Sequence, residues 1–394
     1  MRDVVVAGVG MTPFGKHPAR TIRSLVEDAV ASAIADAGMP SPGEAGLAAY
    51  SNVLSGVLQG QESTRGQHAL RDTALRGVSV VNVENACASG ATGLHLAWLA
   101  VASGQVEVAV AVGAEKLSVP DKARAAAALT TALDQDRLAE LDAELGLSGP
   151  GSVFMEIYTR WAAGYLDSSD ATLEDFARIA VKNHAHGAVN PWAQYGARMT
   201  VEEVLSARRV SELLTVPMCA PMSDGAAAVV VTTPAVAARW DADSVRLRAT
   251  VVGTGRPGAY GELVPEVARR AYEMASVGPE EVDVVECHDA AAPAELIVME
   301  ELGLCKQGEA VGLLRAGETG VAGRLPVNPS GGLESRGHPL GATGLAQVVE
   351  LTDQLRGRAG ARQVEGARIG VAENAGGYFG PDAAVAAVTV LSTL

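Results

Sequence analysis

The sequence predicts an α/β protein whose sheet is covered by helices on both faces and whose chain carries the same pattern of elements twice. Short apolar runs rich in valine, such as residues 4–9, alternate with segments that have apolar residues at helical spacing, such as residues 22–37. Uninterrupted apolar strands are typical of parallel sheets that are buried on both faces. In addition, residues 89–94 (SGATGL) and 340–345 (LGATGL) agree at five of six positions, each at the start of a predicted helix. The chain is therefore expected to contain two similar halves.

The first half, residues 1–244, alternates strands and helices up to residue 112. Its predicted strands are residues 4–9, 50–58, 78–83, 106–112 and 223–231, and its predicted helices are residues 22–37, 88–103 and a short segment within 233–244. Residues 118–215 break this rhythm because they are more charged, with amphipathic helices expected at residues 121–145 and 172–184. We expect this insertion to be a lid or loop domain laid over the sheet, where ligands are often held.

The second half, residues 245–394, repeats the order of elements. Its predicted strands are residues 249–255, 282–287 and 367–372, and its predicted helices are residues 264–275 and a segment that runs from residue 340 to Gly357. The two similar segments start at residues 89 and 340, an offset of 251, so Cys87 in the first half corresponds to His338 in the second. If the halves pack about a pseudo-twofold axis, these two side chains face each other across one site.

Charge and composition argue against several classes of function. The net charge of −15 argues against a nucleic-acid-binding surface and against attraction to anionic membranes. Four cysteines in 394 residues, without a CxxC pair, do not make a disulfide framework and are expected to be reduced thiols. No run reaches the roughly 18 apolar residues that a membrane span needs, and the first residues lack a signal-peptide pattern. We expect a cytoplasmic protein without a membrane span.

Cys87 lies at the turn between a predicted strand and a predicted helix. The free N–H groups and the positive dipole end of a helix start favour a thiolate there, whereas a small buried cysteine at a tight turn is the structural alternative. His338 lies in a turn bounded by Gly337 and Pro339 and would supply the base that a cysteine nucleophile needs. Its alternative role is to cap a helix. The correspondence between Cys87 and His338 favours the catalytic interpretation.

Two further stretches follow predicted strands, at the edge where open α/β sheets bind ligands. His288 would donate a hydrogen bond to an oxyanion and Asp289 would order the turn, although a histidine satisfied at a strand end is the alternative. Residues 373–377 (ENAGG) end in two glycines, which allow the backbone to approach a ligand closely and offer N–H donors. His184 and His186 have no apparent third partner, so no metal site is expected.

Together these stretches resemble the thiolase superfamily over essentially the whole chain. The resemblance is carried by Ala86-Cys87-Ala88-Ser89-Gly90, His288-Asp289, Gly337-His338-Pro339 and the terminal glycine turn, which occur in the family's order. A His-Asp pair in place of Asn-Glu is similar to the sterol-carrier-protein type. The resemblance implies a five-layered αβαβα fold of two βαβαβαββ halves with a loop-domain insertion. It also implies homodimers or tetramers, and acyl transfer between coenzyme A thioesters with no other cofactor.

The resemblance also implies roles for individual residues. Cys87 would take the acyl group, His338 would activate it, and His288 would help to bind an oxyanion. The backbone N–H groups of Cys87 and Gly376 would form a second oxyanion hole. The sequence departs from the family at the second cysteine, which thiolases use as acid/base in C–C bond chemistry. One family position for it is Asn374 here, which we expect to help bind the substrate or an oxyanion with Gly376, Asp289 and Tyr378, and the sterol-carrier-type position is Ala290.

Three functions therefore stay open. The first is a thiolase-like acyltransferase that passes an acyl group from Cys87 to an already activated carbon nucleophile. The second is a retro-aldol lyase on a coenzyme A thioester that works with a small OB-fold or zinc-ribbon partner, with Tyr378 as candidate acid/base. The third is a non-catalytic subunit of a multi-enzyme complex.

Overall fold

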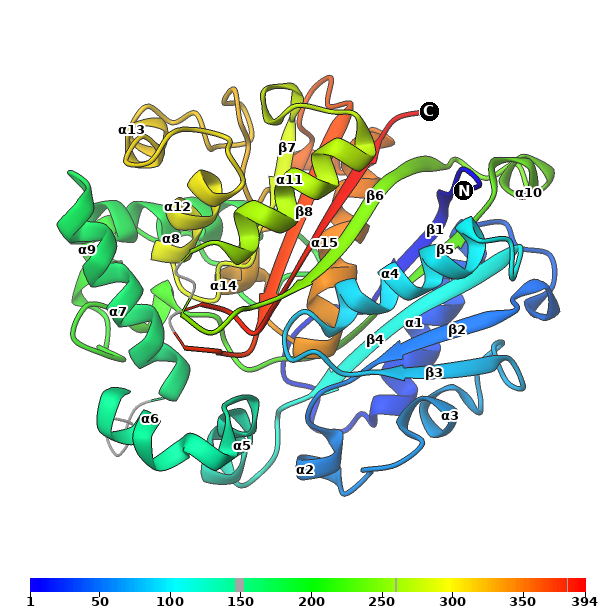
Figure 1. Cartoon of the computed structure of the whole chain (residues 1–394), viewed down its shortest axis with the longest axis horizontal. Helices are drawn as coiled ribbons and strands as arrows, with labels where there is room; N and C mark the ends of the chain where they lie inside the picture. The colour runs from blue at the N-terminus through cyan, green and yellow to red at the C-terminus, as the bar shows by residue number, and fades with distance from the viewer. Residues whose placement is uncertain (146–151, 259–260, 381) are drawn as a thin grey trace.

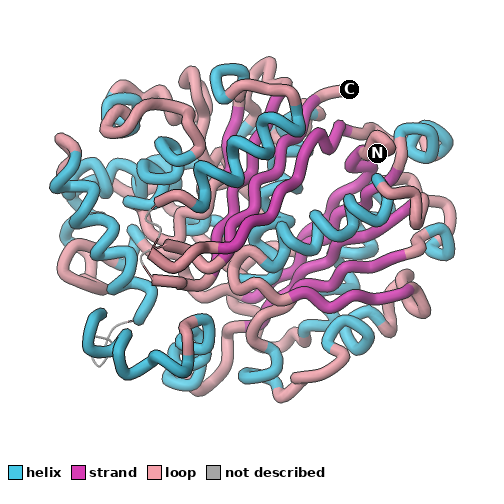
Figure 2. The backbone as a smooth tube through the Cα atoms, in the orientation of Figure 1, coloured by secondary structure: helices cyan, strands magenta, loops and turns pink. Residues whose placement is uncertain are grey.

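The computed structural model describes residues 1–145, 152–258, 261–380 and 382–394. Within these residues nine strands form one sheet in the order β3-β2-β4-β5-β1-β6-β9-β8-β7 (Figures 1 and 2). The strands are β1 (Val5–Met11), β2 (Leu47–Ser51), β3 (Ser79–Val83), β4 (Val108–Lys116), β5 (Asp224–Thr232), β6 (Val245–Thr254), β7 (Val284–Glu286), β8 (Ile369–Gly376) and β9 (Val385–Ser392). The predicted division of the chain at residue 244 lies between the last helix before β6 and β6 itself.

Helices lie on both faces of this sheet. The α-helices are α1 (Ile22–Asp36), α2 (Ser55–Gln59), α3 (Arg65–Leu70), α4 (Ser89–Ala102), α5 (Lys122–Leu129), α6 (Leu138–Leu145), α7 (Val153–Ser168), α8 (Leu173–Gly187), α9 (Val201–Ser206), α10 (Pro234–Arg239), α11 (Leu263–Ala275), α12 (Pro293–Glu301), α13 (Ala310–Arg315), α14 (Gly332–Arg336) and α15 (Leu340–Leu355). Helix α1 packs on β1, β5 and β4, and α11 packs on β6 and β9. Helices α4 and α15 contact each other and lie between the two parts of the sheet, which gives the expected αβαβα layering (Figure 1).

The sheet is mixed, which corrects the prediction of a parallel sheet. Strands β2, β3 and β4 are parallel and so are β7 and β8, but β5 is antiparallel to both β4 and β1, and β9 is antiparallel to β6 and β8. The reversal between β4 and β5 follows from the insertion. Lys116 at the end of β4 pairs in register with Asp224 at the start of β5. The insertion between them therefore leaves β4 and enters β5 at the same end of these two neighbouring strands. Hydrophobic runs show that strands are buried, but they do not show their direction.

Two predicted elements have different bounds in the structure. The strand expected at residues 50–58 ends at Ser51, because the carboxylate of Glu115 accepts the N–H groups of Val53 and Leu54 and turns the chain into α2. The helix expected at residues 121–145 is broken into α5 and α6, with short 3-10 turns between them. Helix α7 and strand β9 were not predicted from the sequence. Figure 1 shows the helices of the insertion gathered at one side of the molecule, beside α12 and α14.

The repeated segments bring the starts of α4 and α15 together. A Cβ atom on Gly90 would lie 2.9 Å from the carbonyl oxygen of Gly341, and one on Gly344 would lie 2.6 Å from the backbone nitrogen of Ala91. Neither position has room for a side chain, so the glycines of the two similar segments allow the helices to cross at backbone contact. This crossing sets the distance between the turns that precede the two helices.

Candidate active site

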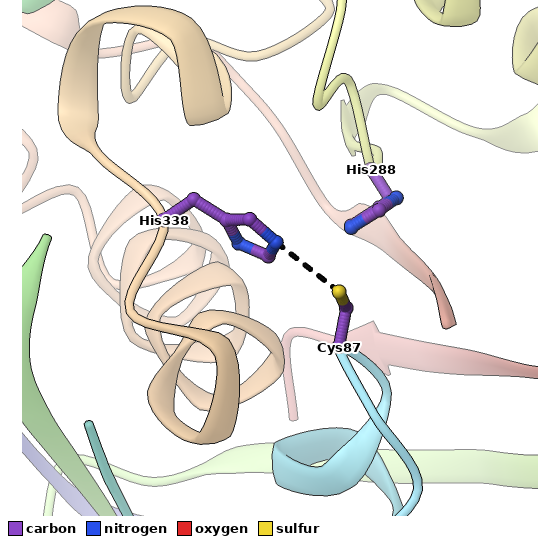
Figure 3. A group of neighbouring side chains, drawn as sticks. All are labelled: Cys87, His288 and His338. Atoms are coloured by element: carbon purple, nitrogen blue, oxygen red, sulfur yellow. Dashed lines mark hydrogen bonds between the residues drawn. The ribbon is translucent and has the colours of Figure 1, made fainter. Parts of the chain in front are cut away.

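The turns before α4 and α15 bring Cys87 and His338 into contact. The Sγ atom of Cys87 lies 3.3 Å from Nε2 of His338, although the residues are 251 positions apart (Figure 3). Cys87 is held by a tight turn in which Ala86 adopts a left-handed backbone with a φ of 47°. Such a conformation in a non-glycine residue costs about 1–3 kcal/mol and persists only where the surroundings impose it. Here the side chain of Ser89 imposes it, by accepting from the Asn85 N–H at 2.8 Å and donating to the Ala86 carbonyl at 2.6 Å.

Hydrogen bonds fix the orientation and the tautomer of His338. Its ring Nδ1 lies 2.8 Å from Oγ1 of Thr343, and that hydroxyl lies 3.1 Å from the carbonyl oxygen of Pro339, to which it donates. The Thr343 oxygen therefore accepts a hydrogen bond from the Nδ1–H group, which assigns the ring hydrogen to Nδ1. The lone pair of Nε2 is then directed at the Cys87 sulfur, as a base for its proton requires. The backbone N–H of His338 also donates to Oγ of Ser223 at 3.0 Å.

Burial keeps this pair neutral. Burial, together with the nearby carboxylates of Glu115 and Glu84, raises the pKa of the Cys87 thiol to about 12, although hydrogen bonding to the Cys87 backbone N–H opposes this shift. The pKa of His338 is held well below its ordinary value by burial and by His288 and Arg336. These shifts favour a neutral thiol over the thiolate that the helix start alone would favour, because desolvation outweighs the helix dipole. A thiol next to an unprotonated imidazole needs that imidazole as base at the moment of attack.

His288, two residues after the end of β7, joins the same group. The reactive atoms of Cys87, His288 and His338 all lie within 4.8 Å of one another, and the two imidazole centroids are 5.1 Å apart (Figure 3). The backbone N–H of His288 donates to Oε2 of Glu373 at 2.9 Å. Burial lowers the pKa of His288 to about 4, so its ring is neutral. Its buried Nε2 has no hydrogen-bond partner within the described parts of the chain, which leaves it available to a ligand.

Asp289 and Asn374, two predicted site residues, lie behind the site. Asp289 is fully buried, accepts from the backbone N–H of Leu333 at 2.7 Å and from the side chain of Asn183 at 2.9 Å, and thereby holds the start of α14. Asn374 is also buried, and neither residue is among those that line the cavity in the described structure. Strand β8 instead presents Glu373 and Ala375 to the cavity, because side chains alternate along a strand.

The terminal glycines lie against the nucleophile. A Cβ atom on Gly376 would lie 2.7 Å from the backbone nitrogen of Cys87 and 2.8 Å from that of Ala88. Gly377 has a φ of 67°, a left-handed backbone that glycine adopts without strain. Tyr378 is buried, lines the cavity and packs with Ile157. The main chain of Gly376 thus lies beside the N–H groups that start α4.

A cavity of about 1190 Å³ opens at these residues. One of its walls is the face of α7 that carries Phe154, Tyr158, Trp161 and Tyr165 at helical spacing. Tyr158 reaches the group of Cys87, His288 and His338, called the catalytic group below. Its hydroxyl lies 3.4 Å from Nδ1 of His288. No helix was predicted here from the sequence, although the spacing of the four aromatic residues is a signal for one helical face. The contact between Glu373 and His288 was likewise not predicted.

The histidines of the insertion are engaged elsewhere. Nε2 of His184 lies 3.3 Å from the carbonyl oxygen of Pro217, and Nδ1 of His186 lies 2.9 Å from that of Asn328. The two rings therefore point at different carbonyl groups. The atoms of Cys87, His288 and His338 are close enough to surround a metal ion, but the His338 ring already contacts the sulfur as a base would. No helix in the described parts of the chain has both the length and the apolar character that crossing a membrane requires.

Comparisons with known proteins agree with this fold. The family model described as the N-terminal domain of thiolase matches residues 4–235, and the one described as thiolase C-terminal domain-like matches residues 259–393. An acetyl-CoA acetyltransferase of Methanothermobacter thermautotrophicus is 36% identical over 390 residues, which cover 96% of this chain and 98% of that one. Human sterol carrier protein 2 is 35% identical over 392 residues, which cover 95% of this chain and 70% of that protein.

Two further relatives are named for other reactions. The benzoylsuccinyl-CoA thiolase subunit BbsB of Thauera aromatica is 34% identical over 372 residues, which cover 92% of each chain. Among solved structures, an Ltp2-ChsH2(DUF35) aldolase is 25% identical with a TM-score of 0.81, covering 99% of this chain and 98% of that chain. The fold and the Cys-His-His group define an α/β protein of the acyltransferase class. The chain belongs to the thiolase family.

Proposed function

We propose that this protein forms an acyl thioester on Cys87 from an acyl-CoA and passes the acyl group to a carbon nucleophile. The observation that carries the proposal is the 3.3 Å contact between Cys87 Sγ and His338 Nε2. His338 takes the thiol proton, the sulfur attacks the thioester carbonyl, and coenzyme A leaves. In this proposal the N–H groups of Cys87 and Gly376 and the free ring nitrogen of His288 stabilise the oxyanions. Apart from the coenzyme A thioester, which is a substrate, this chemistry needs no cofactor.

Mass spectrometry of the protein after incubation with an acyl-CoA tests this proposal. We expect one acyl adduct on the peptide that contains Cys87, and no adduct in Cys87→Ala. Cys219 provides a matched control because it also lines the cavity, while its thiol contacts the carbonyl oxygen of Thr215 at 3.4 Å. The variant Cys219→Ser should therefore be acylated like the wild type. An unmodified Cys87 after incubation with small and large acyl-CoAs would contradict the proposal.

The aromatic face of α7 supports a bulky acyl group. A cavity of about 1190 Å³ exceeds the range of about 300–1,000 Å³ that is usual for small-molecule sites. Trp161 packs edge-on against Tyr158 with 5.1 Å between centroids, and the hydroxyl of Tyr165 donates to Glu300 at 2.7 Å, so the wall is fixed in place. Aromatic walls gain most from ring-containing ligands. The acyl group we propose contains an aromatic or alicyclic ring.

The names of two relatives favour a second candidate function. One similar structure is an aldolase in complex with a DUF35 protein, and another relative is named as a thiolase subunit. A retro-aldol lyase that works with a small OB-fold or zinc-ribbon partner is therefore the alternative, with Tyr378 in the cavity as its candidate acid/base. It predicts that Cys87→Ser keeps most of the activity, because no acyl-enzyme forms. Unchanged activity of the complex after Cys87→Ala would instead indicate a non-catalytic subunit.

Strand β3 supports a homodimer as part of this proposal. It is the edge strand of the sheet, and its side chains at Ser79, Val81 and Asn82 are exposed, with Val81 42% accessible. An exposed edge strand presents unpaired backbone groups that a second copy can pair with. Light scattering of the purified protein should therefore give the mass of a dimer or tetramer. A charge introduced at this edge, Val81→Asp, should shift the mass toward that of one chain.

A further inference from the structure

At neither family position does this chain carry the second thiol that a C–C bond-breaking thiolase would use, and the other thiol that lines the cavity, Cys219, is directed at the carbonyl oxygen of Thr215. The side chain of Asn374 does not reach the cavity, and Ala290 presents only a methyl group to it. Within the cavity, the hydroxyl of Tyr158 contacts the catalytic group, 3.4 Å from His288 Nδ1. We propose, building on the acyl-Cys87 function, that the Tyr158 phenol is the catalytic acid/base that replaces the missing cysteine.

The position of Tyr158 is fixed from three sides. It lies in the middle of α7, its ring contacts Trp161 edge-on, and its hydroxyl meets the ring of His288. The residue is only 6% exposed yet lines the cavity, so its remaining free surface is the surface that a substrate would contact. The phenol is therefore held beside His288, whose ring lies within 4.8 Å of the Cys87 sulfur, in the cavity that would hold the bound acyl group.

Burial keeps the proton on the phenol until a strongly basic acceptor forms. It raises the pKa of Tyr158 well above its ordinary value, and the acidic groups nearby add to this effect: Cys87, Glu373, Asp289 and Cys287. The phenol is therefore the favoured form in the resting protein. A group that holds its proton fits the direction in which a C–C bond is cleaved, because cleavage produces a carbanion that must be protonated.

The proposed cleavage balances without a further reactant. His338 takes the proton of Cys87, and the sulfur attacks the 3-oxo carbon of a 3-oxoacyl-CoA. The C2–C3 bond breaks, its electron pair goes to C2 of the departing thioester, and Tyr158 gives its proton to C2. Free coenzyme A then gives its thiol proton to the Tyr158 phenolate and attacks the acyl-Cys87 carbonyl. Cys87 leaves as a thiolate and takes its proton back from His338. Two thioesters result, and nothing is oxidised or reduced.

Other groups of the cavity fit this role less well. Glu373 is fully buried and accepts the backbone N–H of His288, which makes it a positioning residue. His338 is already the base for Cys87. Tyr378 packs with the apolar side chains of the insertion, Leu133 and Leu141 among them, beside Ile157. The Tyr158 phenol, by contrast, contacts a catalytic histidine directly.

Two assays on the same protein distinguish the role proposed for Tyr158 from the acylation of Cys87, on which that role depends. The first is acylation of Cys87 by benzoyl-CoA, followed by mass spectrometry, which needs no carbon acid. The second is cleavage of 3-oxo-3-phenylpropanoyl-CoA or acetoacetyl-CoA with free coenzyme A. We expect Tyr158→Phe to be acylated within threefold of the wild type and to lose cleavage by about 100-fold, the scale of one general acid. Tyr272→Phe is the matched control, since it removes a buried phenol that donates to Leu302 on another helix. It should keep both reactions.

The outcomes have distinct meanings. Absence of acylation in the wild type would refute the proposed function and this inference with it. Acylation without cleavage of either 3-oxoacyl-CoA by the wild type would refute the inference alone. Cleavage by Tyr158→Phe within threefold of the wild type, or an equal loss of both reactions, would also refute it, because the phenol would then be dispensable or merely structural. Selective loss of cleavage in Tyr378→Phe, with Tyr158→Phe active, would assign the role to Tyr378 instead.

Discussion

Gly376 lies against the backbone of Cys87 with no space between them for a side chain. Its missing Cβ would stand 2.7 Å from the Cys87 nitrogen, and the residues belong to opposite halves of the chain. The backbone at the end of β8 therefore packs directly against the backbone at the start of α4. This contact places the main chain of Gly376 beside the backbone nitrogens of Cys87 and Ala88, next to the sulfur that we propose to carry the acyl group.

Replacing Gly376 with alanine tests that contact. The methyl group would meet backbone atoms that cannot rotate away, so β8 or the Cys87 turn must shift, at a cost of about 1–3 kcal/mol in the free energy of unfolding. We expect acylation of Cys87 to slow by about 100-fold, the effect of losing one oxyanion donor. Gly312→Ala in α13 is the control, since nothing lies within 4 Å of its added Cβ. An active Gly376→Ala would argue against an oxyanion site here.

Thr343→Val tests the assigned tautomer of His338. Valine has nearly the shape of threonine but leaves the ring Nδ1–H buried without an acceptor, which costs about 1–3 kcal/mol. The ring can then turn or change tautomer, so we expect the acylation rate to fall at least about tenfold while Cys87 stays in place. Thr352→Val on the same helix is the comparison, because its buried hydroxyl has no partner within the described residues. It should leave rate and stability unchanged.

The rate at which iodoacetamide alkylates Cys87 should depend steeply on pH. Because burial raises the pKa of this thiol to about 12, the thiolate is the minor form at neutral pH. Its fraction, and with it the alkylation rate, should rise about tenfold per pH unit between pH 7 and pH 10. Peptide mapping separates Cys87 from the other cysteines. A rate that is already constant above about pH 6 would instead show a thiolate–imidazolium pair.

The aromatic wall should set the preference for the acyl group. Trp161→Ala removes the largest ring of the α7 face, so kcat/KM for a ring-containing acyl-CoA should fall about 10–100-fold, while kcat/KM for acetyl-CoA should change little. Leu166→Ala on the same helix is the control, because Leu166 packs against the core and is not among the described residues that line the cavity. Equal losses for both substrates in Trp161→Ala would mean that the wall supports the fold and does not select the acyl group.

Much of the site follows from short, local patterns. The repeated glycine-containing segments mark two equivalent helix starts, and their offset of 251 residues is enough to pair Cys87 with His338. The His288-Asp289 pair and the terminal glycines each follow an apolar strand. The fold brings His288 and Gly376 to the cavity that Cys87 also lines. Such patterns can be read from sequence because strands, turns and helix starts depend on neighbouring residues.

Tertiary structure decided the rest, because it depends on contacts between distant segments. The direction of β5 and β9, the burial that keeps Cys87 protonated, and the placement of Asp289 behind the site are examples. Asn374 lies on the face of β8 away from the cavity, whereas its neighbour Glu373 faces the cavity and accepts the backbone N–H of His288. Which of two adjacent residues faces the cavity depends on how the strand is placed in the sheet. The sequence by itself determined that Cys87 and His338 form a pair. Only the packing of α7 against the catalytic group brought Tyr158 to His288, since no local pattern records which side chain a helix face will meet.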